Sequence, residues 1–247
     1  MSKIIIITGA GDGLGRALAR RFARDGETVV LLGRTLAKVQ AVADELGAPH
    51  FALACDVGQP DSVRAAFAEI AKVHPRINVL INNAAIYYPA ALDDVADDTV
   101  RETLDTNLAG PIYTSRAALP LLCDGGHIIN VTTEAAPLRM PMHWLYAGTK
   151  QAIELMSEAW MRELADQGIR VTIAQCGQMA DETKTGSTWP PELSARFHAA
   201  NMAAGLNLRT RGTSHYNHVT DAFATIVNSA PDLNIAKVEI RGRPVAR

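Results

Sequence analysis

The sequence has few cysteines and few aromatic residues, and neither sign of charge is in clear excess. Its three cysteines, Cys55, Cys123 and Cys176, are an odd number at wide spacing, so we expect neither a disulfide framework nor a cysteine metal site. Lys and Arg together number 24 against 26 Asp and Glu, which excludes a strongly basic nucleic-acid binder. The densest apolar run, residues 4–7, is far shorter than the roughly 18 residues of a membrane span.

The overall composition is that of a globular chain. Hydrophobic residues make up 48% of the 247 residues and charged residues 20%, which is enough apolar surface for a large core and excludes a disordered or collagen-like chain. Thr8 and Gly9 interrupt the N-terminal apolar run at once, so we expect no signal peptide. These features predict a cytoplasmic protein with no membrane partner.

Short β-branched runs alternate with alanine-rich stretches of helical period. Because the runs lack alternation of polar and apolar residues, they predict strands buried on both faces. We expect seven strands, at residues 3–8, 28–32, 50–55, 78–82, 127–132, 169–174 and 236–240. Strand–helix–strand repetition of this kind predicts an α/β fold, a doubly wound parallel sheet with helices on both faces.

Apolar periodicity also predicts where the main helices lie. They are expected at residues 14–25, 36–46, 61–73, 97–122 and 146–167. Asp61 is a candidate N-cap, and Pro111 is a candidate kink. No linker or repeat divides the chain, so we expect a single domain over residues 1–247. Residues 177–212 have few core signals, which indicates an insertion that binds substrate.

A glycine-rich segment follows the first expected strand and begins the first expected helix. Residues 8–15 have the sequence T-G-A-G-D-G-L-G. Glycines let the backbone turn tightly and approach a pyrophosphate, and the N–H groups at the start of the helix favour an anion. This placement predicts a dinucleotide-binding turn.

The spacing T-G-x-x-x-G-x-G resembles that of the short-chain dehydrogenase/reductase family. Further motifs of that family follow in order: Asp56 after the third strand, N-N-A-A at residues 82–85, and Y-x-x-x-K from Tyr146 to Lys150. The resemblance extends from residue 3 to residue 240. It implies a Rossmann-type fold and an oxidoreductase that uses a nicotinamide cofactor.

Four residues are candidates for catalysis. Residues four apart share one face of a helix, and an ammonium beside a phenol lowers the phenol pKa from its usual value of about 10. We therefore expect Lys150 to lower the pKa of Tyr146, which exchanges a proton with the substrate oxygen. The resemblance implies that Asn107 supports a water relay to Lys150. Thr133 stands where the family has a serine, and its hydroxyl can still orient a carbonyl.

The resemblance assigns cofactor contacts to a larger set of residues. They are Gly9, Gly11, Asp12, Gly13, Leu14, Gly15, Arg34, Thr35, Asp56, Val57, Asn83, Ala84, Ala85, Tyr146, Lys150, Gly177 and Met179. Gly33 stands where an acidic residue would bind the ribose 2′-OH, and Arg34 can pair with a 2′-phosphate. Asp12 favours the opposite, because many NADP-dependent relatives have a basic residue there. We favour NADP(H), with NAD(H) as the alternative.

Substrate contacts are expected from Thr133, Glu134, Trp144, Tyr146 and Met179. Further candidates for this pocket are Tyr87, Tyr88, Ala135, Met140, His143 and Trp189. Aromatic and methionine side chains predict a mostly apolar small molecule, with cyclic and aryl compounds as candidates. The acidic residues Glu134, Asp181 and Glu182 support a second hypothesis, a cationic substrate such as an amino ketone or imine. His215 and His218 have no evident third ligand, so no metal is expected.

These residues together predict an NADP(H)-dependent ketoreductase that transfers hydride reversibly between nicotinamide and a carbonyl or secondary alcohol. Two alternatives stay open. An imine reductase could use the same scaffold, because a fold does not settle the substrate. A non-catalytic, cofactor-sensing protein would account for three departures from the family pattern, at Thr133, Cys176 and Asp181. The resemblance and the apolar stripe on helix 146–167 also predict a homo-oligomer, a tetramer or a dimer.

Overall fold

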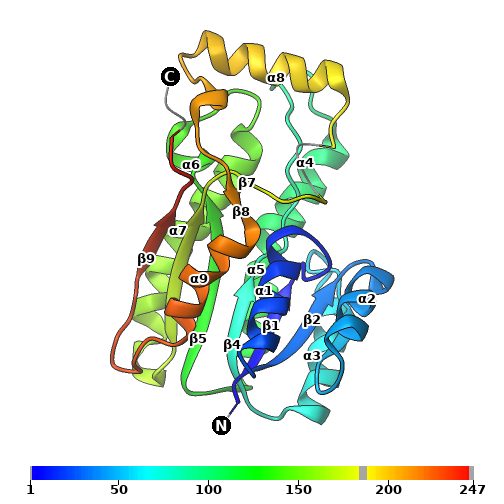
Figure 1. The fold of residues 1–247 in the computed structure, drawn as a ribbon, viewed down its shortest axis with the longest axis vertical. Coiled ribbons are helices and arrows are strands. Elements are labelled where there is room, and N and C mark those ends of the chain that lie inside the picture. The colour runs from blue at the N-terminus through cyan, green and yellow to red at the C-terminus, as the bar shows by residue number, and fades with distance from the viewer. Residues whose placement is uncertain (1, 184–187, 245–247) are drawn as a thin grey trace.

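The computed structural model describes residues 2–183 and 188–244, and it shows an α/β fold with a central sheet between two layers of helices (Figure 1). The sheet has seven parallel strands in the order β3-β2-β1-β4-β5-β6-β9. They are β1 (Ile4–Thr8), β2 (Thr28–Gly33), β3 (Phe51–Ala54), β4 (Ile77–Asn82), β5 (Leu122–Thr133), β6 (Arg170–Cys176) and β9 (Lys237–Ile240). The predicted Rossmann-type fold is confirmed. The strand bounds differ most from the predicted ones at β5, which begins at Leu122 rather than at residue 127.

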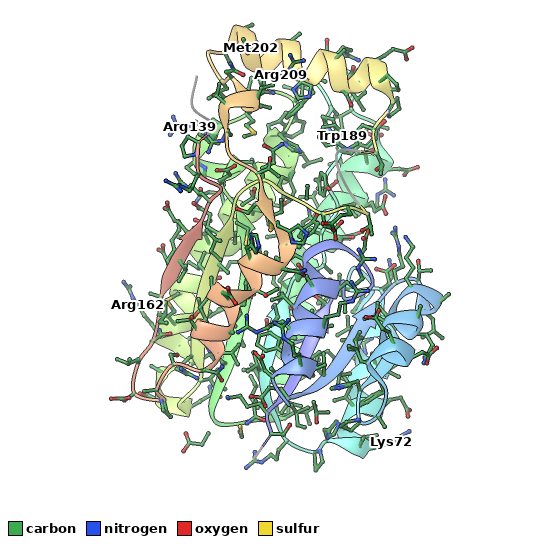
Figure 2. All side chains as sticks on the ribbon, in the orientation of Figure 1. Lys72, Arg139, Arg162, Trp189, Met202 and Arg209 are labelled. Atoms are coloured by element: carbon green, nitrogen blue, oxygen red, sulfur yellow. The ribbon has the colours of Figure 1, made fainter. Side chains whose placement is uncertain are left out.

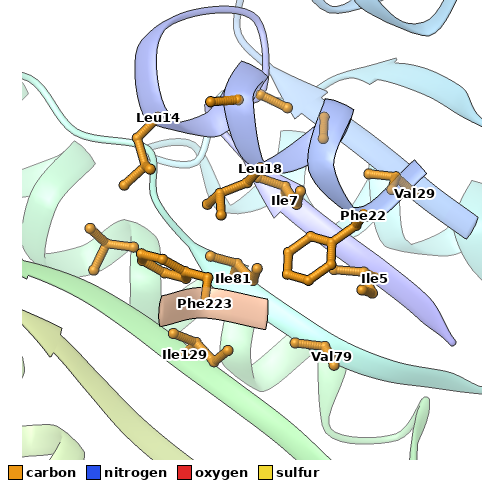
Figure 3. Close-up of a cluster of buried hydrophobic side chains, with 14 of the residues drawn as sticks. Ile5, Ile7, Leu14, Leu18, Phe22, Val29, Val79, Ile81, Ile129 and Phe223 are labelled. Carbon is orange, nitrogen blue, oxygen red and sulfur yellow. The ribbon is translucent and has the colours of Figure 1, made fainter. Parts of the chain in front are cut away.

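Helices cover both faces of the sheet. They are α1 (Gly13–Arg24), α2 (Leu36–Leu46), α3 (Pro60–Val73), α4 (Asp97–Leu104), α5 (Gly110–Ala118), α6 (Ala135–Leu138), α7 (Trp144–Glu163), α8 (Pro191–Ala203) and α9 (Tyr216–Val227). Ile5 and Ile7 of β1 pack with Phe22 of α1 and Phe223 of α9 (Figure 3), whereas Ile6 faces the core under α3 and α5. Because alternate residues of one strand enter two cores, the strands are apolar throughout.

The predicted helix over residues 97–122 ends earlier, at Ala118, and a π-helical turn interrupts it. The chain forms α4, then a π-helical turn, η1 (Asp105–Ala109), then α5, which ends at Ala118. The N–H of Gly110 donates to the carbonyl of Asp105, five residues back. Pro111 has no N–H for the carbonyl of Asn107, so regular α-helical bonding cannot continue through this point.

Two further helix predictions need correction. Asp61 is not the cap of α3: Gln59 holds that position, and Pro60 begins the helix, where its fixed φ suits the first turn. The predicted helix 146–167 begins two residues earlier, at Trp144, and its last turn is a separate 3-10 helix, η2 (Ala165–Gln167).

The segment 177–212 is more regular than its composition indicates. It contains the strand β7 (Met179–Ala180), the helix α8 and the 3-10 helix η3 (Leu208–Thr210). β7 pairs with β8 (Ser214–His215) in a small second sheet. In Figure 1, α8 lies at the end of the molecule toward which the strands of the main sheet run. This placement puts the segment over the carboxyl ends of the strands.

His127 on β5 gives the fold a defined sensitivity to acid. The residue is 1% exposed, its Nε2 lies 2.8 Å from Thr172 Oγ1, and burial lowers the pKa of His127 from 6.5 to about 3. Between these two pKa values the unfolded chain binds a proton that the folded chain does not, so acid favours unfolding. We expect His127 to remove about 1.4 kcal/mol of unfolding free energy for each pH unit below about 6.

Urea unfolding of the protein and of His127→Gln over this pH range measures that contribution. Glutamine keeps a donor for Thr172 but does not titrate, so its unfolding free energy should fall less steeply with acid. Equal slopes for the two proteins would contradict the prediction.

Candidate active site

The glycine-rich turn lies at the edge where the strands end, and the segment after β4 holds it. The Thr8 hydroxyl oxygen accepts hydrogen bonds from the N–H groups of Asn83 and Ala84, each at 3.0 Å. The Asn83 side-chain amide donates to the carbonyl oxygens of Thr8 and Gly9, at 2.9 and 3.2 Å. Asn83, predicted as a cofactor residue, therefore uses its side chain to position the turn.

Two glycines of this turn cannot be replaced without strain. Gly9 has a φ of 65°, in the left-handed region that favours glycine. A Cβ on Gly15 would lie 2.2 Å from the Gly9 carbonyl oxygen, which is far inside contact distance. The carboxylate of Asp12 accepts a hydrogen bond of 2.7 Å from the Gly13 N–H and caps α1. The close packing of the turn on α1 depends on these residues.

A cavity of about 690 Å³ is lined both by the glycine-rich turn and by Tyr146. The predicted cofactor residues that line it are Gly9, Gly11, Asp12, Gly13, Leu14, Arg34, Thr35, Asp56, Val57, Asn83, Ala84, Ala85, Tyr146, Lys150, Gly177 and Met179. Gly15 was also predicted to contact the cofactor but is not part of the lining. Of the predicted substrate residues, Thr133, Glu134, Tyr146 and Met179 line it too. The tertiary fold thus brings residues from both predicted sets to one cavity.

Trp144 does not occupy its predicted place in the substrate pocket. The residue is 38% exposed, and its indole Nε1 donates to the Ala90 carbonyl oxygen at 3.1 Å. Trp144 is absent from the cavity lining, whereas His143 and Tyr146 are part of it. The reason is the helical period, because residues adjacent in sequence at the start of α7 point in different directions.

Tyr146, Thr133 and Lys150 meet at the floor of the cavity. Thr133 ends β5, and a hydrogen bond to the Thr133 hydroxyl favours the ionised form of Tyr146. Lys150 is 2% exposed, and its Nζ donates to the Val131 carbonyl oxygen at 2.8 Å. A phenol, a hydroxyl and an ammonium therefore converge from α7 and β5.

The predicted lowering of the Tyr146 pKa by Lys150 is not seen in this arrangement. Burial raises the pKa of Tyr146 to about 12, and the hydrogen bond to Thr133 offsets only part of this rise. Burial also lowers the pKa of Lys150 to about 8. Desolvation penalises the charged form of both groups. Near neutral pH, Tyr146 therefore carries its proton.

Asn107 lies in the π-helical turn and is fully buried. Its side-chain oxygen accepts from the Ile86 N–H at 2.9 Å, and its Nδ2 donates to the Ile86 carbonyl at 2.7 Å. Both halves of the amide are therefore used to fix the chain that follows β4. The water relay from Asn107 to Lys150 stays a prediction.

The residues that depart from the family pattern after β6 have structural roles. Cys176 is 4% exposed, and burial raises the pKa of its thiol to about 12, so it is a packing residue and not a nucleophile. Asp181 forms an ion pair with Arg16 of α1, with a distance of 3.4 Å from Oδ2 to Nη2. The same guanidinium donates a hydrogen bond of 2.6 Å to the Thr183 hydroxyl. These contacts attach the segment after β7 to α1.

Arg34 lines the cavity and contacts an acidic residue from another element. Its Nη1 lies 2.6 Å from Glu102 Oε1 of α4, and both side chains are more than half exposed. The Glu102 carboxylate raises the pKa of Arg34. Since an exposed ion pair contributes only about 0–1 kcal/mol, a stronger anion can displace Glu102 from Arg34.

The acidic residues that supported a cationic substrate have partners within the chain. Glu134 is buried and forms an ion pair with Arg211. Glu182 lies 3.3 Å from His215 on the exposed surface. Arg211 compensates the charge of Glu134, and Glu182 does not line the cavity, so neither residue favours an amine there.

Several lining residues were not predicted from the sequence. They are Lys38, Phe197, His198, Leu208, Arg211 and Tyr216. Phe197 and Leu208 belong to α8 and η3, in the segment whose sequence has few core signals. The sequence signal that could have located Phe197 is the run of good helix formers that follows Pro191.

In residues 2–183 and 188–244, no group of three or more His, Cys, Asp or Glu could hold a metal ion. The rings of His215 and His218 have centroids 5.5 Å apart and are tilted by 47°. All three cysteines are free. No helix within the described part of the chain has the length and apolar character of a membrane span.

The chain is similar to a known group of proteins. A family model described as short chain dehydrogenase matches residues 3–191. An uncharacterised oxidoreductase from Methylorubrum extorquens is 32% identical over 198 residues, which cover 78% of this chain and 80% of that protein. A 3β-hydroxysteroid dehydrogenase from Mediterraneibacter gnavus is 34% identical over 172 residues, which cover 68% and 62% of the two chains.

Similarity extends to solved structures. A short chain dehydrogenase from Burkholderia cenocepacia, crystallised in complex with NADP, is 26% identical with a TM-score of 0.81, and the match covers 98% of this chain and 96% of that one. The chain spans 57 to 62% of the length of several curated relatives.

Proposed function

The chain belongs to the short-chain dehydrogenase/reductase family of oxidoreductases, and from that premise we propose that it is an NADP(H)-dependent carbonyl reductase. The reaction is reversible hydride transfer between nicotinamide and a carbonyl or secondary alcohol of a mostly apolar substrate. One observation carries the proposal: Tyr146, Thr133 and the buried Lys150 line the same cavity as the glycine-rich turn. The names of the relatives, an oxidoreductase and a dehydrogenase, favour an enzyme over the sensor. The ion pair between Glu134 and Arg211 removes support for an imine substrate, so we do not propose the imine reductase.

The cavity fits a dinucleotide. The backbone of Gly9 has a conformation that favours glycine, and there is no room for a side chain at Gly15. The positive end of the α1 dipole favours binding of the pyrophosphate. Asp56 and Val57 would contact the adenine end, and Lys150 the nicotinamide ribose. When bound, the nicotinamide supplies or accepts the hydride.

Residues of this chain handle the proton. In reduction, the Tyr146 O–H donates its proton to the substrate oxygen as the carbonyl carbon gains the hydride. The Thr133 hydroxyl donates a hydrogen bond to the same oxygen and orients it. Burial keeps the proton on Tyr146 until the substrate oxygen takes it, and Lys150 does not lower the Tyr146 pKa in this arrangement. Asn107 keeps the segment after β4 in place, and in this proposal it supports a water relay that returns a proton to Lys150.

The experiment that tests the reaction follows loss of NADPH absorbance with a panel of cyclic and aryl ketones, and gain of NADPH absorbance with the corresponding alcohols. Turnover of any of them supports the proposal. Cofactor binding without turnover of any ketone or alcohol would contradict it.

Arg34 is expected to determine the preference for NADPH. Arg34→Asp should weaken NADPH binding about tenfold to a hundredfold, because it removes a charge-assisted hydrogen bond to the 2′-phosphate. NADH has no such phosphate, so its affinity should be kept or improved. Fluorescence titration with both cofactors measures the two dissociation constants. An unchanged ratio of NADPH to NADH affinity would refute this role.

A matched variant tests the contact with Glu102. Glu102→Gln removes the competing carboxylate 2.6 Å from Arg34 and should tighten NADPH binding by about twofold to fivefold. NADH binding should not change. Combining Glu102→Gln with Arg34→Asp should abolish the gain.

Three further properties are proposed with the function. The chain forms a homotetramer or a dimer, and the exposed residues Leu104 of α4 and Leu155 of α7 (39% and 68%) support this. Light scattering of the purified protein measures the oligomeric state.

Residues 1–247 act as a single domain with a substrate-binding insertion at 177–212. A cytoplasmic location stays a prediction, supported by the free cysteines.

A further inference from the structure

Five side chains form an aromatic cage at one end of the cavity: Tyr87, His143, Tyr146, Trp189 and Phe197, all of which line it. The His143 ring centroid lies 5.0 Å from that of Phe197, 5.2 Å from Tyr146 and 5.7 Å from Trp189. The Tyr87 centroid lies 5.8 Å from Tyr146 and 6.0 Å from Trp189. Figure 2 shows Trp189 below α8, on the side of the molecule where α4 lies. The cage is therefore assembled from the segment after β4, the start of α7, and α8 with the residues before it.

His143 is a polar group in this cage without a polar partner. Within residues 2–183 and 188–244, neither of its ring nitrogens has a hydrogen-bond partner, and the residue is only 9% exposed. A buried polar atom left unsatisfied costs about 1–3 kcal/mol, so such atoms usually have a partner. Burial lowers the pKa of His143 to about 4. At neutral pH the ring therefore offers one donor and one acceptor.

The surrounding groups are already committed to other contacts. The backbone N–H of His143 donates to the Met140 carbonyl at 3.1 Å, and the backbone carbonyl of His143 accepts from the Ala147 N–H at 2.8 Å. Only the ring of His143 is therefore available to a ligand. The Trp189 Nε1 donates to the Tyr87 carbonyl at 3.3 Å. The five side chains of the cage carry no charge near neutral pH. No carboxylate belongs to the cage, so a cation buried there would lack a counter-ion, which favours a neutral ligand.

His143 and Tyr146 are directed to the same place. They are three residues apart at the start of α7, and such residues share one helix face. A ring held among Tyr87, Trp189 and Phe197 would contact aromatic faces and edges. When a ring ketone binds here with its carbonyl oxygen at Tyr146 and Thr133, a second polar group on the same ring system reaches His143.

We infer that His143 is a substrate-binding residue, and that the substrate is a neutral one- or two-ring ketone with a hydroxyl group that hydrogen-bonds His143. A hydroxyl can both donate and accept a hydrogen bond. It can therefore donate to the unprotonated ring nitrogen of His143 or accept from the protonated one. On binding, the substrate separates His143 from one of the rings that now cover it. The inference rests on the proposed function for the position of the reacting carbonyl at Tyr146.

The test compares two ketones that differ by one hydroxyl group, 6-hydroxy-2-tetralone and 2-tetralone. In His143→Phe, which keeps an aromatic ring without nitrogens, the ratio of kcat/KM for the hydroxylated over the plain ketone should fall about fivefold to tenfold. The loss should appear mainly as a higher KM for the hydroxylated ketone. His143→Gln, which keeps a donor and an acceptor, should recover part of the ratio.

His74→Phe is a matched control. His74 also has an unpartnered buried Nε2 and stacks on Phe51 with centroids 5.8 Å apart, but it does not line the cavity, so its replacement should leave the ratio unchanged. An unchanged ratio in His143→Phe would overturn the inference and show that the nitrogens contact only aromatic faces.

A binding measurement separates failure of this inference from failure of the proposed function. Calorimetric titration of both ketones into the NADPH-loaded protein needs no turnover. Weaker binding of the hydroxylated ketone alone in His143→Phe supports the inference even if neither ketone is reduced. Equal affinities in the two proteins, or no binding of either ketone, would overturn it.

Discussion

Replacement of Tyr146 by phenylalanine is expected to lower kcat by about a hundredfold to ten-thousandfold, with the dissociation constant for NADPH changed by no more than about twofold. The substitution removes the proton donor and little else. A phenylalanine ring keeps the contacts with Tyr87 and His143, whose centroids lie 5.8 and 5.2 Å away. Steady-state kinetics and a fluorescence titration with NADPH measure the two quantities.

Variants at Thr133 provide the controls for this result. Thr133→Ser keeps the hydroxyl that hydrogen-bonds Tyr146 and should retain turnover. Thr133→Val removes that hydroxyl at nearly constant volume and should lose much of it. Substantial turnover by Tyr146→Phe would refute the assignment of Tyr146 as the proton donor, because phenylalanine has no proton to give.

Replacement of Gly15 by alanine is expected to damage both cofactor binding and the fold. The new Cβ would lie 2.2 Å from the Gly9 carbonyl oxygen and 2.6 Å from Asn83 Nδ2, and backbone cannot yield as a flexible side chain can. Overpacking of this kind typically costs about 1–3 kcal/mol of stability. The turn must also move, so NADPH should bind at least about tenfold more weakly. Urea unfolding and cofactor titration measure the two effects.

Gly148→Ala is the matched substitution, because it makes the same chemical change in another helix. Gly148 is exposed in α7, and a Cβ there would meet no atom within 4 Å. Alanine is the better helix former, so this variant should gain about 0.5–1 kcal/mol of stability. If both variants lost equal stability, the cause would lie in removing glycine and not in the contact with Gly9.

Local patterns predicted much of the site because they depend on near neighbours. Residues 8–15 lie between a strand and a helix, and the four-residue interval from Tyr146 to Lys150 puts both on one helix face. The apolar runs predicted all seven strands of the main sheet, since both faces of that sheet are covered. The end of helix 97–122 was missed because Leu122 pairs with Ile77 of β4, a partner far away in the sequence.

What the sequence by itself determined is the type of each element, the position of the glycine-rich turn and the spacing of the residues on α7. These follow from backbone preferences and periodicity, which act over a few residues. Only the tertiary structure decided that Trp144 faces away from the cavity, that Glu102 competes for Arg34, and that Phe197 and Trp189 enclose His143. Burial and long-range contact set these relations, and they also reversed the expected shift of the Tyr146 pKa, because desolvation depends on everything packed around the phenol.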